Sequence, residues 1–157
     1  MDVIDSSAVP GTWTFEALYR SHHVPMVRLG FLLTGSQEVA EELAHEAFLL
    51  VHGRMGTVRE PPAYLRQVVV NLTRQHHRRA EVERRRAPAP PGPVLPSEID
   101  ETWDLLWRLP ERQRIAVVLR FYGDLTVPQV AEAMECRLGT AKSLIHRALG
   151  SLKESLT

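Results

Sequence analysis

The segment 125–152, LTVPQVAEAMECRLGTAKSLIHRALGSL, carries polar side chains at a spacing suited to contacting DNA. Lys142 and His146, like Ser143 and Arg147, are four residues apart and would share one face of a helix. Cationic and hydroxyl groups on such a face donate hydrogen bonds to phosphate oxygens and to base edges. Together with Thr140, these side chains predict a compact surface for binding nucleic acid.

Two short helices joined by a turn would position this surface. Val127, Val130, Ala131 and Met134 fall at i, i+3, i+4 and i+7, one apolar stripe of a helix. Thr126 can cap that helix, and Glu135-Cys136-Arg137 makes the turn. The second helix has an expected inner face of Leu138, Ala141, Ile145, Ala148, Leu149 and Leu152. This layout predicts a helix-turn-helix, whose second helix fits the major groove, although an ordinary helical hairpin shows the same periodicity.

Charge is segregated along the 157 residues, although 19 basic and 19 acidic residues give a formal net charge of zero. The acidic cluster comprises Glu38, Glu41, Glu42 and Glu46, and the basic cluster comprises Arg74, Arg78, Arg79, Arg84, Arg85 and Arg86. A bipolar chain can present an acidic face to one partner and a basic face to another. The basic cluster is denser than a helix dipole needs, which favours anion binding.

Several classes of protein are disfavoured. Cys136 is the single cysteine, so no internal disulfide can form and a reducing compartment is expected. No apolar run reaches the roughly 18 residues of a membrane span, and the acidic N-terminus does not read as a signal peptide. His45 and His52 are seven residues apart, whereas two histidines that coordinate one metal ion from a helix are usually four residues apart. We expect a cytoplasmic protein that is not an enzyme, with no catalytic residues, metal or cofactor.

The pattern of helices predicts an all-α fold of two small helical domains. A helix should begin near Thr14, break or kink at Pro25 and end at Thr34-Gly35. The next, about Gln37–His52 after a Ser36 cap, should bury Val39, Leu43, Ala47 and Leu50. A third should run from Pro61 to about Arg79 and bury Tyr64, Leu65, Val68, Val69 and Leu72.

The second domain should begin with two further helices. Ser97 can cap a helix carrying Ile99, Trp103, Leu106 and Trp107. Pro110 starts another, which carries Ile115, Val118, Leu119 and Tyr122 and ends at Gly123.

Residues 87–97, APAPPGPVLPS, contain five prolines and predict an extended linker of roughly 34 Å. The expected organisation is a flexible N-terminus 1–12, a first domain 13–86, the linker 87–97 and a second domain 98–157.

Two separate stretches resemble one family. The first stretch resembles region 4 of bacterial sigma factors of the extracytoplasmic-function group. It runs from RLPERQR through DLT and LGTAKSLIHRAL to residue 155. The first domain resembles region 2 of that group in FEALYRSHHVPMVRLGFLLTGS, VAEELAHEAFLLVHGRM and PPAYLRQVVVNLTRQHHRR. The resemblance covers about residues 13–86 and 98–155, with the proline linker in place of region 3.

The resemblance implies a promoter-specificity subunit of RNA polymerase. The residues implied to meet the −35 element are Arg137, Thr140, Lys142, Ser143, His146 and Arg147. Those implied to meet the −10 element are Arg54, Arg59, Arg66, Asn71, Arg74, Gln75, Arg78 and Arg79. The acidic helix would dock on the β′ clamp of core polymerase through Glu38, Glu41, Glu42, His45 and Glu46. The region Trp103–Tyr122 would meet the β flap. Promoter DNA and an anti-sigma factor are the other implied partners, with no membrane insertion of the chain itself.

The turn departs from the family pattern. Glu135-Cys136-Arg137 stands where Gly-Cys-Ser is usual, so the glycine of a left-handed turn and the capping serine are both replaced. Loss of such a cap costs about 1 kcal/mol. Two alternatives stay open on the sequence: a stand-alone helix-turn-helix regulator that binds an operator, and an adaptor that has lost DNA recognition.

Overall fold

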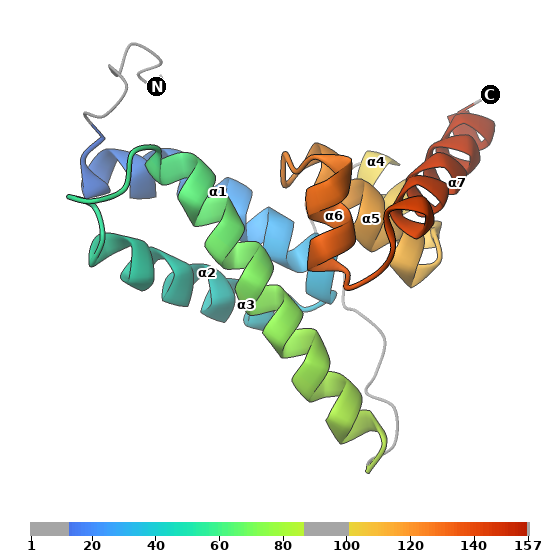
Figure 1. Ribbon diagram of the computed structural model, residues 1–157, viewed down its shortest axis with the longest axis horizontal. Coiled ribbons are helices and arrows are strands. Elements are labelled where there is room, and N and C mark those ends of the chain that lie inside the picture. The colour runs from blue at the N-terminus through green and yellow to red at the C-terminus, as the bar shows by residue number, and fades with distance from the viewer. Residues whose placement is uncertain (1–12, 87–100, 157) are drawn as a thin grey trace.

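The computed structural model describes residues 13–86 and 101–156 as seven α-helices without a strand in those ranges. This confirms the predicted all-α class. Helices α1–α3 form an N-terminal bundle and α4–α7 a C-terminal bundle (Figure 1). The expected flexible N-terminus 1–12, the linker 87–97, and the roles of Ser97 and Ile99 lie outside the described residues.

Helix α1 (Phe15–Thr34) starts and ends as predicted. The Thr14 hydroxyl accepts a hydrogen bond from the Ala17 amide, and Gly35 ends the helix in the left-handed region with φ 79°. Of the two outcomes predicted at Pro25, a break or a kink, the break is wrong, because α1 continues through it. Pro25 lies on the exposed side of α1, while Met26 and Leu29 stay buried.

Helix α2 (Gln37–His52) has the predicted bounds, and the Ser36 hydroxyl accepts from the Val39 amide at 3.2 Å. Its inner face was predicted wrongly in part. Small side chains (Ala40, Ala44 and Ala47) are buried with Phe48 and Val51, whereas Val39 and Leu43 are half-buried and Leu50 is 49% exposed. A Cβ on Gly30 of α1 would lie 3.1 Å from Ala40 Cβ, so α1 and α2 approach too closely for leucines at the crossing.

Helix α3 (Pro61–Arg84) is longer than predicted, since it continues past Arg79. Leu65, Val68, Val69 and Leu72 are buried as predicted, and Tyr64 is half-buried. Val70 and Thr73 are buried in addition. The end of α3 projects beyond both bundles (Figure 1), and residues 81–86 are exposed.

The C-terminal bundle consists of α4 (Glu101–Arg108), α5 (Glu111–Phe121), α6 (Val127–Ala133) and α7 (Leu138–Leu156). The Thr126 hydroxyl and the Gln129 side chain form a reciprocal capping box at the start of α6. Along α5, Val118 and Leu119 are buried as predicted, but Ile115 is half-buried and Tyr122 is 43% exposed. Along α7, Ala141, Ile145 and Ala148 are buried and Leu152 is half-buried.

Leu138 and Leu149 of α7 were predicted to face inward, and this is wrong: they are 44% and 43% exposed. The short α6 and α5 cover only a narrow stripe of α7, and these two leucines lie at its margins.

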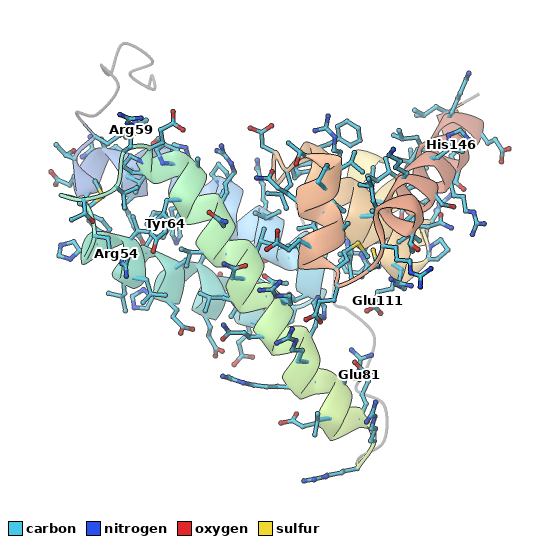
Figure 2. The ribbon with its side chains drawn as sticks, in the orientation of Figure 1. Arg54, Arg59, Tyr64, Glu81, Glu111 and His146 are labelled. Atoms are coloured by element: carbon cyan, nitrogen blue, oxygen red, sulfur yellow. The ribbon has the colours of Figure 1, made fainter. Side chains whose placement is uncertain are left out.

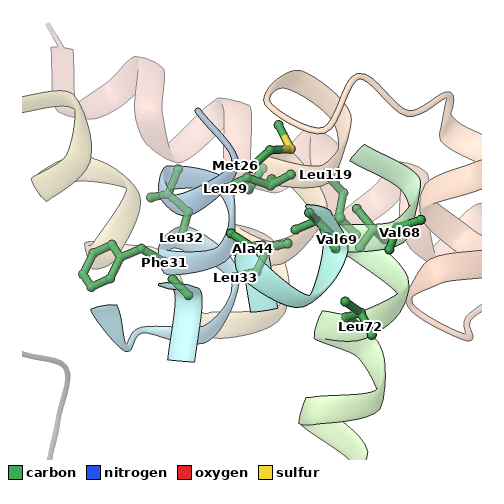
Figure 3. Packing of buried hydrophobic residues seen from close by; sticks show 14 of the residues in the cluster. Met26, Leu29, Phe31, Leu32, Leu33, Ala44, Val68, Val69, Leu72 and Leu119 are labelled. Atoms are coloured by element: carbon green, nitrogen blue, oxygen red, sulfur yellow. The ribbon is translucent and has the colours of Figure 1, made fainter. Parts of the chain in front are cut away.

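The buried hydrophobic residues of the two bundles form one cluster. Figure 3 shows Leu119 of α5 within the cluster that α1, α2 and α3 build. The Phe31 ring of α1 packs edge-on against Trp107 of α4, with 5.4 Å between ring centroids. The bundles therefore pack against each other through side chains from α1, α4 and α5.

Candidate nucleic-acid interface

The outer face of α7 presents the side chains predicted for DNA contact. Lys142, His146 and Arg147 are exposed, as is Arg137 just before the helix, and Thr140 and Ser143 are half-buried. Figure 2 shows His146 on α7, at the end of the molecule opposite Arg54 and Arg59. Ala141, Ile145 and Ala148 bury the opposite face, which fixes the rotation of α7. The arrangement gives one cationic surface open to a duplex.

The turn before α7 adopts a left-handed conformation at Glu135, with φ 55°. The Arg137 carbonyl accepts from the Ala141 amide at 3.0 Å, so Arg137 stands at the helix start. Its side chain carries no oxygen that could accept from the first amides of α7, unlike a serine or threonine. Those amides remain donors that a phosphate oxygen can use.

Three arginines of α3 face the C-terminal bundle. An Arg66 guanidinium nitrogen lies 3.6 Å from an Asp124 carboxylate oxygen. Arg74 donates to the Glu132 carbonyl at 3.3 Å. Arg78 forms a salt bridge with Glu135, and its Nε donates to Glu135 Oε2 at 3.3 Å. Of the other α3 residues predicted for the −10 element, Asn71 is half-buried, whereas Gln75 and Arg79 are exposed.

The loop between α2 and α3 carries Arg54 and Arg59, both exposed. The Arg54 carbonyl accepts from the amides of Thr57 and Val58 at 2.9 and 3.1 Å, which makes the loop compact. Figure 2 shows Arg54, Arg59 and Tyr64 at the end of the molecule away from α7. The structure therefore separates these loop arginines from the three that contact the C-terminal bundle.

The acidic face of α2 is open. Glu38, Glu41, Glu42, His45 and Glu46 are all exposed, and Glu41 accepts a hydrogen bond from Gln37 Nε2 at 3.1 Å. Leu49 and Leu50 follow on the helix, 60% and 49% exposed. Sequence reasoning missed this apolar extension because Leu50 was assigned to the core. The combined face therefore presents both anionic and apolar groups to solvent.

Burial changes the titration of three histidines. His77 Nε2 donates to the Leu33 carbonyl at 2.8 Å, and desolvation lowers the pKa of His77 although that hydrogen bond opposes the shift. Burial also lowers the pKa of His22 and of His76, helped by the charges of Arg66 and Arg79 respectively. These rings are therefore favoured in their neutral form inside the fold.

Arg114 is a buried cation that sequence reasoning missed. It is 8% exposed, its Nε donates to the Leu32 carbonyl at 3.2 Å, and burial lowers its pKa. The available signal was its spacing, since Arg114 precedes buried Val117 and Val118 by three and four residues. Asp124 and Glu135, which meet α3, were also missed, because their contacts join segments remote in sequence.

In the part of the chain that the structure describes, no group of three or more His, Cys, Asp or Glu side chains is placed to hold a metal ion. None of the described helices combines the length and the hydropathy that a bilayer crossing needs.

The family model described as Sigma-70, region 4 matches residues 99–152. The chain is 32% identical over 154 residues to the RNA polymerase sigma-E factor of Streptomyces coelicolor, covering 90% of this chain and 85% of that protein. It is 30% identical over 156 residues to the ECF RNA polymerase sigma factor SigM of Mycobacterium tuberculosis, covering 92% and 78%. The fold resembles the sigma factor RpoE of Bartonella quintana, solved in complex with the anti-sigma factor NepR, with TM-score 0.61, 17% identity and coverage of 90% and 97%. The helix-turn-helix, the acidic α2 and these similarities over nearly the whole chain lead to one conclusion: the chain belongs to the extracytoplasmic-function group of RNA polymerase sigma factors.

Proposed function

We propose that the chain binds core RNA polymerase and directs initiation at promoters through −35 and −10 recognition. The observation that carries this proposal is the exposed cationic face of α7, combined in one sigma-family chain with the exposed acidic face of α2. In this assignment Arg137, Thr140, Lys142, Ser143, His146 and Arg147 contact the −35 element. Polar side chains there can read base edges or hold phosphates.

The α2–α3 loop and α3 would hold the −10 element as an unstacked single strand. Extruding a base costs a few kcal/mol, which stacking and edge contacts must offset. The residues assigned to this role are Arg54, Arg59, Arg66, Asn71, Arg74, Gln75, Arg78 and Arg79. Residues 13–86 would thus serve the −10 element and 98–157 the −35 element, joined by 87–97.

The proposed partners follow from the two charged faces. Glu38, Glu41, Glu42, His45 and Glu46 would dock on a basic surface of the polymerase clamp, and exposed Leu49 would add apolar area. The protein would act in the cytoplasm, where polymerase and promoter DNA meet, and the polymerase would perform the catalysis. The Bartonella quintana relative is named in complex with an anti-sigma factor, which supports a similar regulator for this chain.

The decisive experiment is run-off transcription with core polymerase and a pool of genomic promoters from the source organism. We expect specific transcripts that depend on the added protein. Folded protein that binds core polymerase but starts no transcript would contradict promoter recognition. Tight, sequence-specific binding to duplex DNA without polymerase would favour the stand-alone regulator instead.

A further inference from the structure

A cleft of about 370 Å³ separates the second half of α3 from the start of α5 and the turn between α6 and α7. We name it the α3–α5 cleft. Figure 2 labels one residue of each wall, Glu81 on α3 and Glu111 on α5. Sites for small organic ligands usually measure about 300–1,000 Å³, so the cleft has the size of a small-molecule site.

The α3–α5 cleft is lined by four arginines and three glutamates whose charges are only partly paired. Arg78 forms a salt bridge with Glu135, and a Glu81 carboxylate oxygen lies 3.6 Å from an Arg85 guanidinium nitrogen. The charged lining residues outside these pairs are Arg74, Arg84, Arg112 and Glu111. Three cations thus stand against one carboxylate, and this excess attracts an anion.

Arg74 brings an unsatisfied donor to the wall of the cleft. Its Nη1 donates to the Glu132 carbonyl at 3.3 Å, but its Nε is enclosed and has no hydrogen-bond partner. A buried donor left unpaired costs free energy, which a ligand oxygen beside Arg74 would recover. The guanidinium therefore favours an acceptor in the cleft.

The start of α5 is a second and independent feature that favours an anion. Glu111 and Arg112, the first two residues of this 11-residue helix, both line the cleft. Pro110 stands at the N-cap, and no side chain caps the first amides. Uncapped amides at a helix N-terminus, together with the helix dipole, bind phosphate groups.

The remaining lining is apolar. Ile115 of α5, Ala133 of α6 and Met134 are half-buried and expose part of their side chains to the same space. A methionine thioether adapts to the shape of a neighbouring group and makes favourable contacts with aromatic rings. The cleft therefore combines donors for phosphate with a surface for a flat ring.

We propose that the α3–α5 cleft is a binding site for a small phosphorylated ligand of the nucleoside diphosphate class. Arg84, Arg112 and the first amides of α5 hold its phosphates, and its base lies against Met134. The ligand is a free metabolite rather than a nucleic-acid strand, because the cleft has the volume of one small molecule. The inference goes beyond the proposed function and does not rest on it.

The test measures binding of ADP to the full chain by isothermal titration calorimetry in metal-free buffer at fixed low ionic strength. We expect ADP to bind, pyrophosphate to displace it, and adenosine, which lacks phosphate, to bind at least about tenfold more weakly. Absence of ADP binding would overturn the proposal, whereas promoter recognition is tested separately by the run-off assay. Adenosine binding as tightly as ADP, or failure of pyrophosphate to compete, would overturn it as well.

Two arginine variants locate the site. Arg112→Gln and Arg84→Gln each remove one charge from an exposed side chain, and each should weaken ADP binding about five- to tenfold. The matched control is Arg79→Gln, because Arg79 is exposed on the same helix as Arg84 but does not line the cleft. Equal weakening by all three variants would show general attraction to a cationic helix and would overturn the site. Thermal melting followed by circular dichroism shows that each variant is folded.

A gain of affinity gives a readout that unfolding cannot imitate. Glu111→Gln removes the one lining carboxylate that stands outside the two ion pairs, and it should tighten ADP binding about two- to threefold. Unchanged ADP affinity in Glu111→Gln would place the phosphates away from α5 and overturn the proposal. A mixed-sequence DNA strand that binds the parent but not Arg112→Gln, with no ADP binding by the parent, would assign the cleft to nucleic acid instead.

Discussion

The guanidinium carbon of Arg114 lies 3.9 Å from the centre of the Trp107 ring, while its Nε bonds to the Leu32 carbonyl of α1. One buried cation thus joins α5, α4 and α1. Arg114→Ala removes the ring contact, leaves the carbonyl unpaired and opens a void, so we expect a loss of about 2–4 kcal/mol in the free energy of unfolding. Arg114→Met fills the space without a donor and should recover part of that loss. Urea unfolding followed by tryptophan fluorescence measures both, and equal stability of Arg114→Ala and the parent would contradict the assigned contacts.

The crossing of α1 and α2 should not accept an added methyl group. A Cβ at position 30 would meet Ala40 Cβ at 3.1 Å and the Ala40 Cα at 3.2 Å. Gly30→Ala should therefore lower the free energy of unfolding by about 1–3 kcal/mol. Gly150→Ala is the control, since no atom lies within 4 Å of a Cβ there, and it should raise stability by about 0.5–1 kcal/mol. Chemical denaturation compares the two, and a neutral Gly30→Ala would show that the helices can separate at no cost.

Stability should fall on acidification. Burial lowers the pKa of His77, so the folded state disfavours its proton and the unfolded chain binds more protons as the pH falls below about 6.5. The free energy of unfolding should therefore be retained above the unfolded-state pKa of about 6.5 and decrease as the pH falls through and below it, with His22 and His76 adding to the slope. His77→Gln keeps a donor for the Leu33 carbonyl and should flatten that slope. An unchanged slope in His77→Gln would assign the effect to other groups.

The cationic face of α7 should determine −35-dependent initiation. Lys142→Ala and Arg147→Ala remove exposed donors. Each should cost about 1–3 kcal/mol of binding free energy at the −35 element if the side chain contacts a base edge, and initiation should weaken accordingly. Lys153→Ala, exposed in the last turn of the same helix, is the charge-matched control. Run-off transcription on a −35-dependent promoter measures the effect. Full activity of the Lys142→Ala/Arg147→Ala double variant would refute the recognition face.

The acidic face of α2 should control binding to core polymerase. Glu42→Lys/Glu46→Lys reverses two exposed charges and should weaken core binding while leaving the melting temperature near that of the parent, because neither side chain is buried. Glu81→Lys/Glu83→Lys makes the same charge change on the projecting end of α3. Co-purification with core polymerase compares the pairs. Equal core binding by both would place the docking surface elsewhere.

Local signals explain what was predictable. Ser36 and Thr126 cap their helices as expected, α1 begins next to Thr14 as expected, and Gly35 ends α1 in a left-handed conformation. These outcomes depend on hydrogen bonds within a few residues, which the sequence displays directly. The exposed face of α7 follows in the same way from the spacing of its small and apolar residues.

The wrong or missing predictions concern residues whose burial or contacts depend on a segment distant in sequence. Leu50 was assigned to the core because periodicity cannot tell which side of α2 meets Gly30 of α1. The burial of Val70 and the contacts of Asp124 and Glu135 depend on packing between bundles that the sequence divides by a proline-rich stretch. Of the residues assigned to the −10 element, only the structure shows that Arg66, Arg74 and Arg78 are already engaged.

Helix α3 has 24 residues without interruption, a rod of about 36 Å at 1.5 Å per residue. One end is anchored by Leu65 and Val69 in the core, and the other stands clear of both bundles in solvent. Because the helix is continuous, a displacement of its end at Arg84 also moves Arg74 and Arg78. The exposed end of α3 is therefore rigidly connected to the contacts that Arg74 and Arg78 make with the C-terminal bundle.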